Sequence, residues 1–179
     1  VVCEPYFGGD LAKLKRMARK RGVQMTEQWH GRIFRQVLDA VIYLHSKKVV
    51  HCDIKEENVM VSRKGEYHKP PIKLIDFGLA SDFSTISNLK GTCYYMPPEV
   101  WQFGLWTTRG DTFSLGVMFY SVFCDGQVPF YAHCERALRD KICTADPELG
   151  RLDEHPSFQA MIESMLKKRL EDRPTVVKV

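Results

Sequence analysis

The chain has 179 residues, of which 44% are hydrophobic and 27% are charged, and its formal net charge is +4. These values exclude a disordered or collagen-like chain and fit one or two folded domains with a sizeable core. No apolar run reaches the roughly 18 residues of a membrane span, so we expect no transmembrane segment.

The cysteines and the N-terminus bear on the cellular compartment. The six cysteines are scattered, with no C-x-x-C pair and no histidines at zinc-like spacing, so free thiols are expected. The N-terminus lacks a basic region followed by an apolar segment. We therefore expect a cytoplasmic protein, although a signal peptide lying outside this fragment would leave no trace in it.

Two helices are predicted near the start of the chain, over 10–21 and 26–46. Thr26 is suited to cap the second helix, because its hydroxyl can accept a hydrogen bond from a backbone N–H of the first turn. Apolar residues recur along this helix at steps of three and four, which predicts a core stripe of Trp29, Ile33, Val37, Ala40, Val41 and Leu44.

Short apolar runs at 49–50, 59–61 and 72–75 predict small strands, and the polar residues 62–71 predict a surface turn between the last two. Residues 79–96 have no sustained period and are rich in serine, threonine and asparagine, so a loop is expected there. The remaining predicted helices lie near 111–124, 134–142 and 157–167. The first of these is apolar on nearly all faces, which indicates a helix buried in the middle of the fold.

Two short segments gather groups suited to phosphate chemistry. They are His51-Cys52-Asp53-Ile54-Lys55-Glu56-Glu57-Asn58 and Asp76-Phe77-Gly78. The Asp53 carboxylate can orient a substrate hydroxyl and accept its proton, while Lys55 can donate to the moving phosphoryl oxygens. Asn58 and Asp76 offer the oxygen ligands that magnesium prefers.

These segments resemble motifs of eukaryotic protein kinases. Residues 51–58 resemble the catalytic loop, 76–78 the magnesium-binding DFG motif, and 97–99 a variant of the APE motif. Lys55 and the segment 91–96 resemble serine/threonine kinases. The segment 94–96 and the helix beginning near Asp111 resemble most the calcium/calmodulin-dependent and calcium-dependent group. The resemblance implies transfer of the γ-phosphoryl group of ATP to a protein hydroxyl, with Mg²⁺, or alternatively Mn²⁺, as the metal cofactor.

The resemblance covers almost the whole chain and implies an α+β, mainly helical fold. Residues 1–9 resemble the end of the small lobe and the hinge, and residues 10–179 resemble the large C-terminal lobe, in which short strands carry the catalytic loop and the DFG. No glycine-rich loop, strand lysine or helix αC glutamate precedes them. We therefore expect that the small lobe is absent from this fragment and is the partner that it lacks. We also expect the fragment alone to be inactive.

The resemblance also places a nucleotide against the hinge. It implies that the backbone of Glu4 and Tyr6 binds adenine, that Asp10 binds the ribose, and that Leu11 and Met60 form the lower apolar face. For Met60, a purely structural role in the core is an open alternative.

The protein substrate would lie beside the catalytic loop. By resemblance, Thr92 bridges the catalytic Asp53 and Lys55. Glu57 and Asp10 match acidic positions that read basic residues upstream of the acceptor, whereas a further acidic position is Ser121 here. A basic peptide substrate is thus expected, although solvated surface acids remain the alternative.

A third set of residues is expected to support the site. By resemblance, Asp111 binds the backbone of the catalytic loop and supports His51, with simple helix capping as the alternative. Arg173 is expected to pair with Glu99, because a buried carboxylate needs a partner and a guanidinium can bind it through two parallel hydrogen bonds. Phe77 and Gly78 complete the DFG.

Cys52 departs from the family pattern, which has arginine between the histidine and the catalytic aspartate. That arginine binds a phosphorylated activation-loop residue, and a thiol cannot do so. We therefore expect no such clamp, although Ser84, Thr85 and Ser87 are candidate phosphosites. Cys52 and Cys93 are expected to be ordinary reduced thiols, with a redox switch as the alternative.

Two readings other than an active enzyme stay open, a pseudokinase scaffold and an allosteric interaction module. The basic residues of the first helix form either a solvated face or a surface for an acidic partner; they are Lys13, Lys15, Arg16, Arg19, Lys20 and Arg21. Nucleic acid is disfavoured as a partner, because no recognition motif or interleaved aromatic residues accompany this charge.

Overall fold

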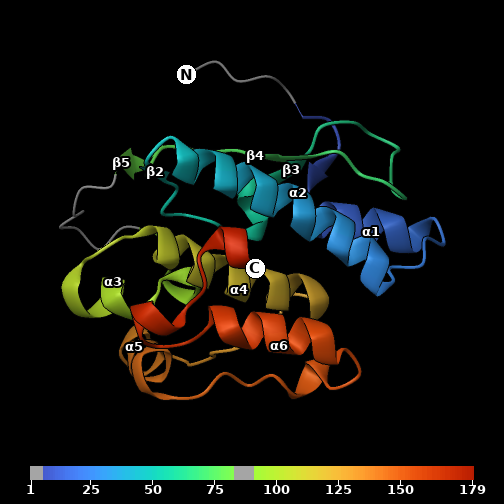
Figure 1. Ribbon diagram of the computed structural model, residues 1–179. Helices are drawn as coiled ribbons and strands as arrows, with labels where there is room; N and C mark the ends of the chain where they lie inside the picture. The colour runs from blue at the N-terminus through green and yellow to red at the C-terminus, as the bar shows by residue number, and fades with distance from the viewer. Residues whose placement is uncertain (1–5, 83–90) are drawn as a thin grey trace.

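Helices make up about half of the computed structural model, which describes residues 6–82 and 91–179 (Figure 1). The helices are α1 (Leu11–Lys20), α2 (Glu27–Ser46), α3 (Pro98–Phe103), α4 (Thr108–Phe123), α5 (Glu135–Thr144) and α6 (Pro156–Met165). The strands are β1 (Gly9–Asp10), β2 (Val49–Val50), β3 (Val59–Val61), β4 (Ile72–Leu74) and β5 (Ser81–Asp82). None of the described helices is long and apolar enough to cross a membrane.

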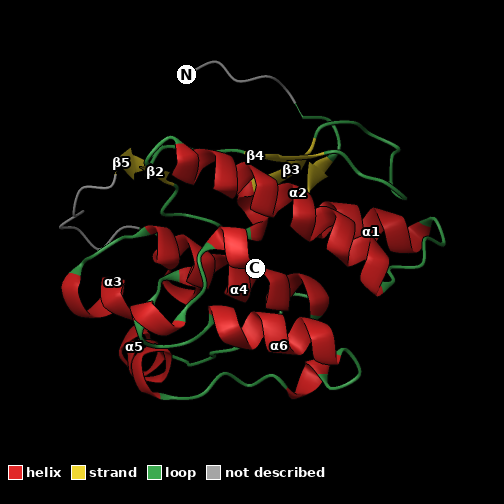
Figure 2. Cartoon of the chain, viewed as in Figure 1, coloured by secondary structure: helices red, strands yellow, loops and turns green. Residues whose placement is uncertain are grey.

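The strands form two small antiparallel sheets along one side of the helices (Figure 2). In the first sheet, β3 lies between β1 and β4, with Val59 opposite Leu74 and Gly9 opposite Val61. The second sheet pairs β2 with β5. Because β2 and β3 flank the 51–58 loop, the two sheets fix both ends of that loop.

Side-chain caps define where the helices begin. Asp10 accepts a hydrogen bond from the N–H of Lys13 at 2.7 Å, and Thr26 accepts one from the N–H of Trp29 at 3.3 Å, which confirms the predicted cap of α2. Helix α4 begins at Thr108, earlier than the predicted start at Asp111, because the hydroxyl of Thr107 is the N-cap and accepts from Gly110. Its first turn is polar, so apolar periodicity does not reveal it.

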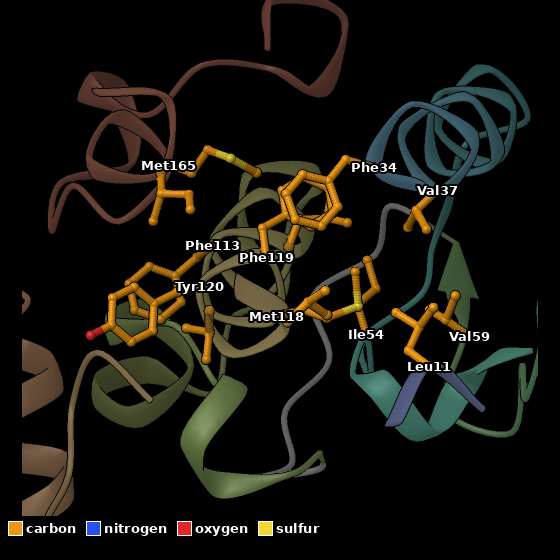
Figure 3. Packing of buried hydrophobic residues seen from close by; sticks show 14 of the residues in the cluster. Leu11, Phe34, Val37, Ile54, Val59, Phe113, Met118, Phe119, Tyr120 and Met165 are labelled. Carbon is orange, nitrogen blue, oxygen red and sulfur yellow. The ribbon is translucent and has the colours of Figure 1, made fainter. Parts of the chain in front are cut away.

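Helix α4 lies at the centre of the core, as its apolar sequence predicts, and its residues are buried on every face. Helix α2 packs on it through Phe34 and Phe119, whose rings stack with centroids 3.9 Å apart (Figure 3). On another side, α6 approaches at Gly116, where a Cβ would lie 2.9 Å from the Cβ of Met165. Burial of this apolar surface is the main force that holds the helices together.

A buried ion pair joins α3 to the C-terminal segment. The guanidinium of Arg173 donates two hydrogen bonds to the carboxylate of Glu99, at 2.8 and 2.5 Å, and both residues are buried. Arg173 also donates to the backbone oxygens of Lys167, Arg109 and Lys168. Each charge is therefore compensated, and removal of one partner leaves the other charge buried and unpaired.

Replacing Arg173 with methionine is expected to lower the free energy of unfolding by about 3–5 kcal/mol, because Glu99 loses its counterion in the interior. Urea denaturation followed by circular dichroism measures this change. Arg169→Met is the matched control; Arg169 forms an exposed pair with Glu171, and its loss is expected to leave the free energy of unfolding nearly unchanged. Equal small effects of the two substitutions would contradict a stabilising buried pair.

Candidate active site

The 51–58 loop is held by one buried carboxylate. Asp111, which is fully buried in α4, accepts hydrogen bonds from the backbone N–H groups of His51 at 2.9 Å and Cys52 at 3.0 Å. The ring of His45, in α2, lies 2.9 Å from the same carboxylate. Asp111 thus binds the loop from within the core and does not cap its own helix. The part played by His45 was not foreseen, because it depends on a contact between residues 66 positions apart.

His51 connects this loop to the 76–78 segment. Its Nδ1 accepts from the N–H of Asp53 at 3.3 Å, and its Nε2 lies 3.1 Å from the carbonyl oxygen of Ile75. This arrangement fits a neutral imidazole that carries its proton on Nε2. The ring also faces that of Phe77, with centroids 5.2 Å apart. The histidine therefore sets the distance between the two segments that carry the candidate chemistry.

The Asp53 side chain lies at the centre of a small polar cluster. Its Oδ1 accepts from the hydroxyl of Thr92 at 2.9 Å and from the Thr92 N–H at 3.2 Å. Its Oδ2 lies 2.8 Å from Nζ of Lys55 and 3.1 Å from Nδ2 of Asn58. Lys55 in turn donates to the Thr92 hydroxyl at 2.8 Å. Asp53 is thus in direct contact with Lys55 and Asn58, which are close to it in the sequence, and with Thr92, which is 39 residues away.

These contacts decide the charge of Asp53. Burial of the carboxyl, which is 8% exposed, acts to raise its pKa. Hydrogen bonds from Lys55, Thr92 and Asn58 outweigh burial, so the pKa lies below its usual value. Asp53 is therefore a carboxylate at neutral pH, able to accept a hydrogen bond from a hydroxyl group.

Asn58 and Asp76 lie at neighbouring ends of β3 and β4. The carbonyl of Asn58 accepts from the N–H of Ile75 at 2.9 Å, which places Asp76 one residue further along. The Asn58 amide nitrogen is used by Asp53, so its oxygen is directed to other partners. Asp76 is exposed, has a positive φ of 62°, and accepts from the N–H of Gly78 at 3.1 Å.

This donor set fits a hard divalent cation that also binds phosphate oxygens. One amide oxygen and one carboxylate suit magnesium, which usually takes one or two protein carboxylates together with substrate phosphates. Residues 6–82 and 91–179 contain no group of three or more His, Cys, Asp or Glu side chains arranged to hold a metal. A cation at Asn58 and Asp76 therefore needs oxygens from a bound ligand.

The residues expected to bind the nucleotide lie near β1. Asp10 pairs with Met60 in the sheet while its side chain caps α1, and Met60 is partly exposed. Leu11 is fully buried and packs within the core, so it presents no surface to a nucleotide. Tyr6 is partly exposed, and Glu4 lies outside the described residues.

Gly91 brings Thr92 against the 51–58 loop. Its φ is 121°, a conformation that side chains rarely adopt, and a Cβ would lie 3.1 Å from the carbonyl oxygen of Cys52. Glycine at this position thus allows the close approach that places the Thr92 hydroxyl on Asp53. Ser84, Thr85 and Ser87 lie outside the described residues.

Cys52 is a buried structural residue in this loop. Burial, followed by the nearby charges of Asp111 and Asp53, raises the pKa of its thiol to about 12. The sulfur lies 3.6 Å from the carbonyl oxygen of Val50. A thiol of this kind is protonated and inert, which favours ordinary reduced cysteine over a redox switch.

Glu56 is a site residue that the sequence did not reveal. Its side chain is 8% exposed, and its Oε1 accepts from the hydroxyl of Ser121 in α4 at 2.5 Å. Burial raises its pKa, and this effect outweighs the hydrogen bond from Ser121 and the charge of Lys15, which act to lower it. The inward direction of Glu56 depends on the short turn over 56–58 and on a partner 65 residues away, so no local pattern signals it.

Comparison with known proteins identifies the family. The sequence matches the family described as "Protein kinase domain" over residues 1–179. The chain belongs to the protein kinase family. This confirms the resemblance inferred from the 51–58 and 76–78 motifs, and the mainly helical fold with few short strands agrees with it.

The relatives of this chain include serine/threonine kinases. The chain is 37% identical over 183 residues to a "Probable myosin light chain kinase" of Dictyostelium discoideum, covering 98% of this chain and 50% of that protein. It is 36% identical over 174 residues to "Calcium/calmodulin-dependent serine/threonine-protein kinase 1" of rice, covering 95% and 28%. It is 31% identical over 184 residues to "Serine/threonine-protein kinase Nek3" of mouse, covering 98% and 34%. The kinase chain thus spans half or less of the length of these relatives.

Proposed function

We propose that this chain carries the catalytic groups of a serine/threonine protein kinase that transfers the γ-phosphoryl group of ATP to a protein hydroxyl. The observation that supports this most directly is the contact of Asp53 with Thr92, Lys55 and Asn58. The cluster brings together an ionised carboxylate, the ammonium group of Lys55 and the amide group of Asn58. Phosphoryl transfer needs such positioning and charge neutralisation more than it needs strong covalent chemistry.

Asp53 orients the attacking hydroxyl in this mechanism. Thr92 holds Oδ1, and Oδ2 accepts the hydrogen bond of the substrate once Lys55 turns to the phosphoryl oxygens. The hydroxyl oxygen bonds to the γ-phosphorus as the bond to the β–γ bridging oxygen breaks, ADP leaves, and the hydroxyl proton passes to Asp53. Because hydrogen bonds keep the pKa of Asp53 below its usual value, the carboxylate is ionised and ready to accept a hydrogen bond from the attacking hydroxyl.

Asn58 and Asp76 would hold the magnesium ion. When bound, the cation would neutralise charge on the phosphate oxygens. Asn58 has a second task, since its amide nitrogen holds both the backbone oxygen and the carboxylate of Asp53. The Asn58 side chain would therefore couple the position of the Asp53 carboxylate to the metal site.

The nucleotide site proposed here has two sides, of which residues 10–179 form the lower one. Tyr6, Asp10 and Met60 lie near β1, where the adenosine part would rest, and residues 1–9 would form the connection to a small lobe. We expect this chain alone to show negligible turnover, because the upper side of the cleft would come from that lobe. Use of Mn²⁺ in place of Mg²⁺ and a cytoplasmic location stay predictions.

Turnover of Mg-ATP by the full-length protein tests this mechanism. Asp53→Asn is expected to lower kcat by about 10²–10⁴-fold, because the amide cannot accept the hydroxyl proton. Asp76→Ala is expected to lower activity to a similar or greater extent, since Asp76 is the one carboxylate proposed to bind the metal. The measurement is phosphate transfer to a protein substrate at saturating ATP.

Lys64→Ala is the control, because Lys64 is exposed in the β3–β4 connection and has no role in the mechanism. Equal activity of wild type, Asp53→Asn and Asp76→Ala would rule out the mechanism. Tight ATP binding without turnover in the wild-type protein would instead favour the pseudokinase reading.

A basic residue upstream of the acceptor is proposed as the main substrate feature. Glu57 and Asp10 were expected to read it, and Glu56 adds a third carboxylate to the same region. Ser121 occupies the position where an acidic residue was missing, and its hydroxyl donates a hydrogen bond to the carboxylate of Glu56. Glu56 of the 51–58 loop thus supplies a carboxylate next to the position in α4 where the family has an acidic residue and this chain has Ser121. An arginine or lysine of the substrate would add to the attraction of Lys15 and further lower the cost of burying the Glu56 carboxylate.

Glu56→Gln is therefore expected to reduce the preference for arginine over norleucine, at one position upstream of the acceptor, by about tenfold or more in kcat/KM. Peptides with arginine moved through each upstream position measure this ratio in wild type and variant. The raised pKa of Glu56 means that the preference should also weaken as pH falls toward the carboxyl range. Glu66→Gln, in an exposed pair with Arg63, serves as control. An unchanged ratio in Glu56→Gln would refute this role.

A further inference from the structure

A basic groove lies on the outer side of α2, away from the Asp53 cluster. It has a volume of about 660 Å³ and runs between α2 and the end of the β3–β4 connection. Figure 1 shows that connection on the same side of the molecule as the first half of α2. This volume is within the range of sites that bind small ligands or a few residues of a peptide.

One side chain of α2 links the two walls of the groove. The carboxamide of Gln36 donates to the carbonyl oxygen of Pro70 at 3.0 Å and accepts from the N–H of Ile72 at 2.9 Å. Nearby, the indole of Trp29 donates to the carbonyl oxygen of Tyr67 at 2.8 Å. A preformed site of this kind spares a ligand the entropic cost of ordering the protein.

The charge of the groove has one sign. Arg32, Arg35 and Lys69 line it, and no acidic side chain does so among the residues that the structure describes. Arg35 pairs with Asp39 at 2.9 Å, whereas Arg32 and Lys69 form no ion pair within residues 6–82 and 91–179. Pro71, which is partly exposed, adds apolar surface to this lining, whereas Pro70 is buried.

We propose that this groove docks an acidic linear segment of a partner protein, in which carboxylates flank an apolar side chain. The carboxylates would contact Arg32 and Lys69, which are exposed, and the apolar side chain would rest on Pro71. Guanidinium groups suit this task, because they bind carboxylates through two parallel hydrogen bonds. The groove is separate from the proposed transfer site, so a docked segment would leave Asp53 accessible.

The test is fluorescence anisotropy of a fluorescein-labelled peptide in which glutamate alternates with leucine, at low ionic strength. Saturable binding is expected to the wild-type protein and not with a peptide that has glutamine in place of glutamate. Joint replacement Arg32→Glu and Lys69→Glu is expected to weaken binding by about tenfold or more, because two exposed attractions become repulsions. Both side chains are exposed, so circular dichroism should show an unchanged fold.

The control is the joint replacement Arg16→Glu and Lys20→Glu on the exposed face of α1, which changes the net charge equally. Binding within about twofold of wild type in this control supports a specific groove. Equal weakening in both variants, or no saturable binding to wild type, would overturn the proposal. Tighter binding of a DNA duplex or of phosphatidylserine vesicles that depends on Arg32 and Lys69 would overturn the choice of an acidic protein segment.

Discussion

The buried carboxylate of Asp111 is the constraint on which the rest of the site depends. It accepts hydrogen bonds from the backbone N–H groups of His51 and Cys52 in the 51–58 loop. Within the described residues, no other carboxylate or carbonyl accepts from these two groups. A buried N–H without a partner costs about 1–3 kcal/mol, so this loop conformation is stable only while Asp111 stays in place. Because Asp111 belongs to the central helix of the core, the geometry of the Asp53 cluster is tied to the packing of the whole domain.

The loop conformation has a cost of its own. Cys52 has a φ of 67° and Asp76 one of 62°, values that are unfavourable for residues other than glycine. Such strain persists only where the surrounding contacts determine the backbone, and it is concentrated at functional sites. Here the contacts are those of Asp111 with Cys52 and of Asp76 with Gly78. Helix packing thus stabilises a backbone that holds Asp53 and Asn58 in contact and places Asp76 next to Ile75, which donates to the carbonyl of Asn58.

Many of the helices and most of the candidate catalytic residues could be predicted from the sequence. The elements and residues that could not be predicted have physical reasons. The helices α1 and α2 have caps and periodic apolar faces, so they were predicted within one or two residues. Strand β5 and helix α3 are too short to show a period, and they stayed unrecognised. The order of Asp53, Lys55, Asn58 and Asp76 identified the kinase family because those groups are close in sequence. Glu56 and His45 act through partners in α4, more than 60 residues away, which only the fold brings near.

Amide hydrogen exchange at His51 and Cys52 tests the central claim most directly. If Asp111 holds the loop, both amides of the wild-type protein should exchange as slowly as those of the buried helix α4, for example Met118. In Asp111→Asn, with one acceptor oxygen in place of two, protection at His51 and Cys52 should fall while that at Met118 is retained. Exchange of the His51 and Cys52 amides in wild type as fast as at the exposed Lys64 would contradict the account.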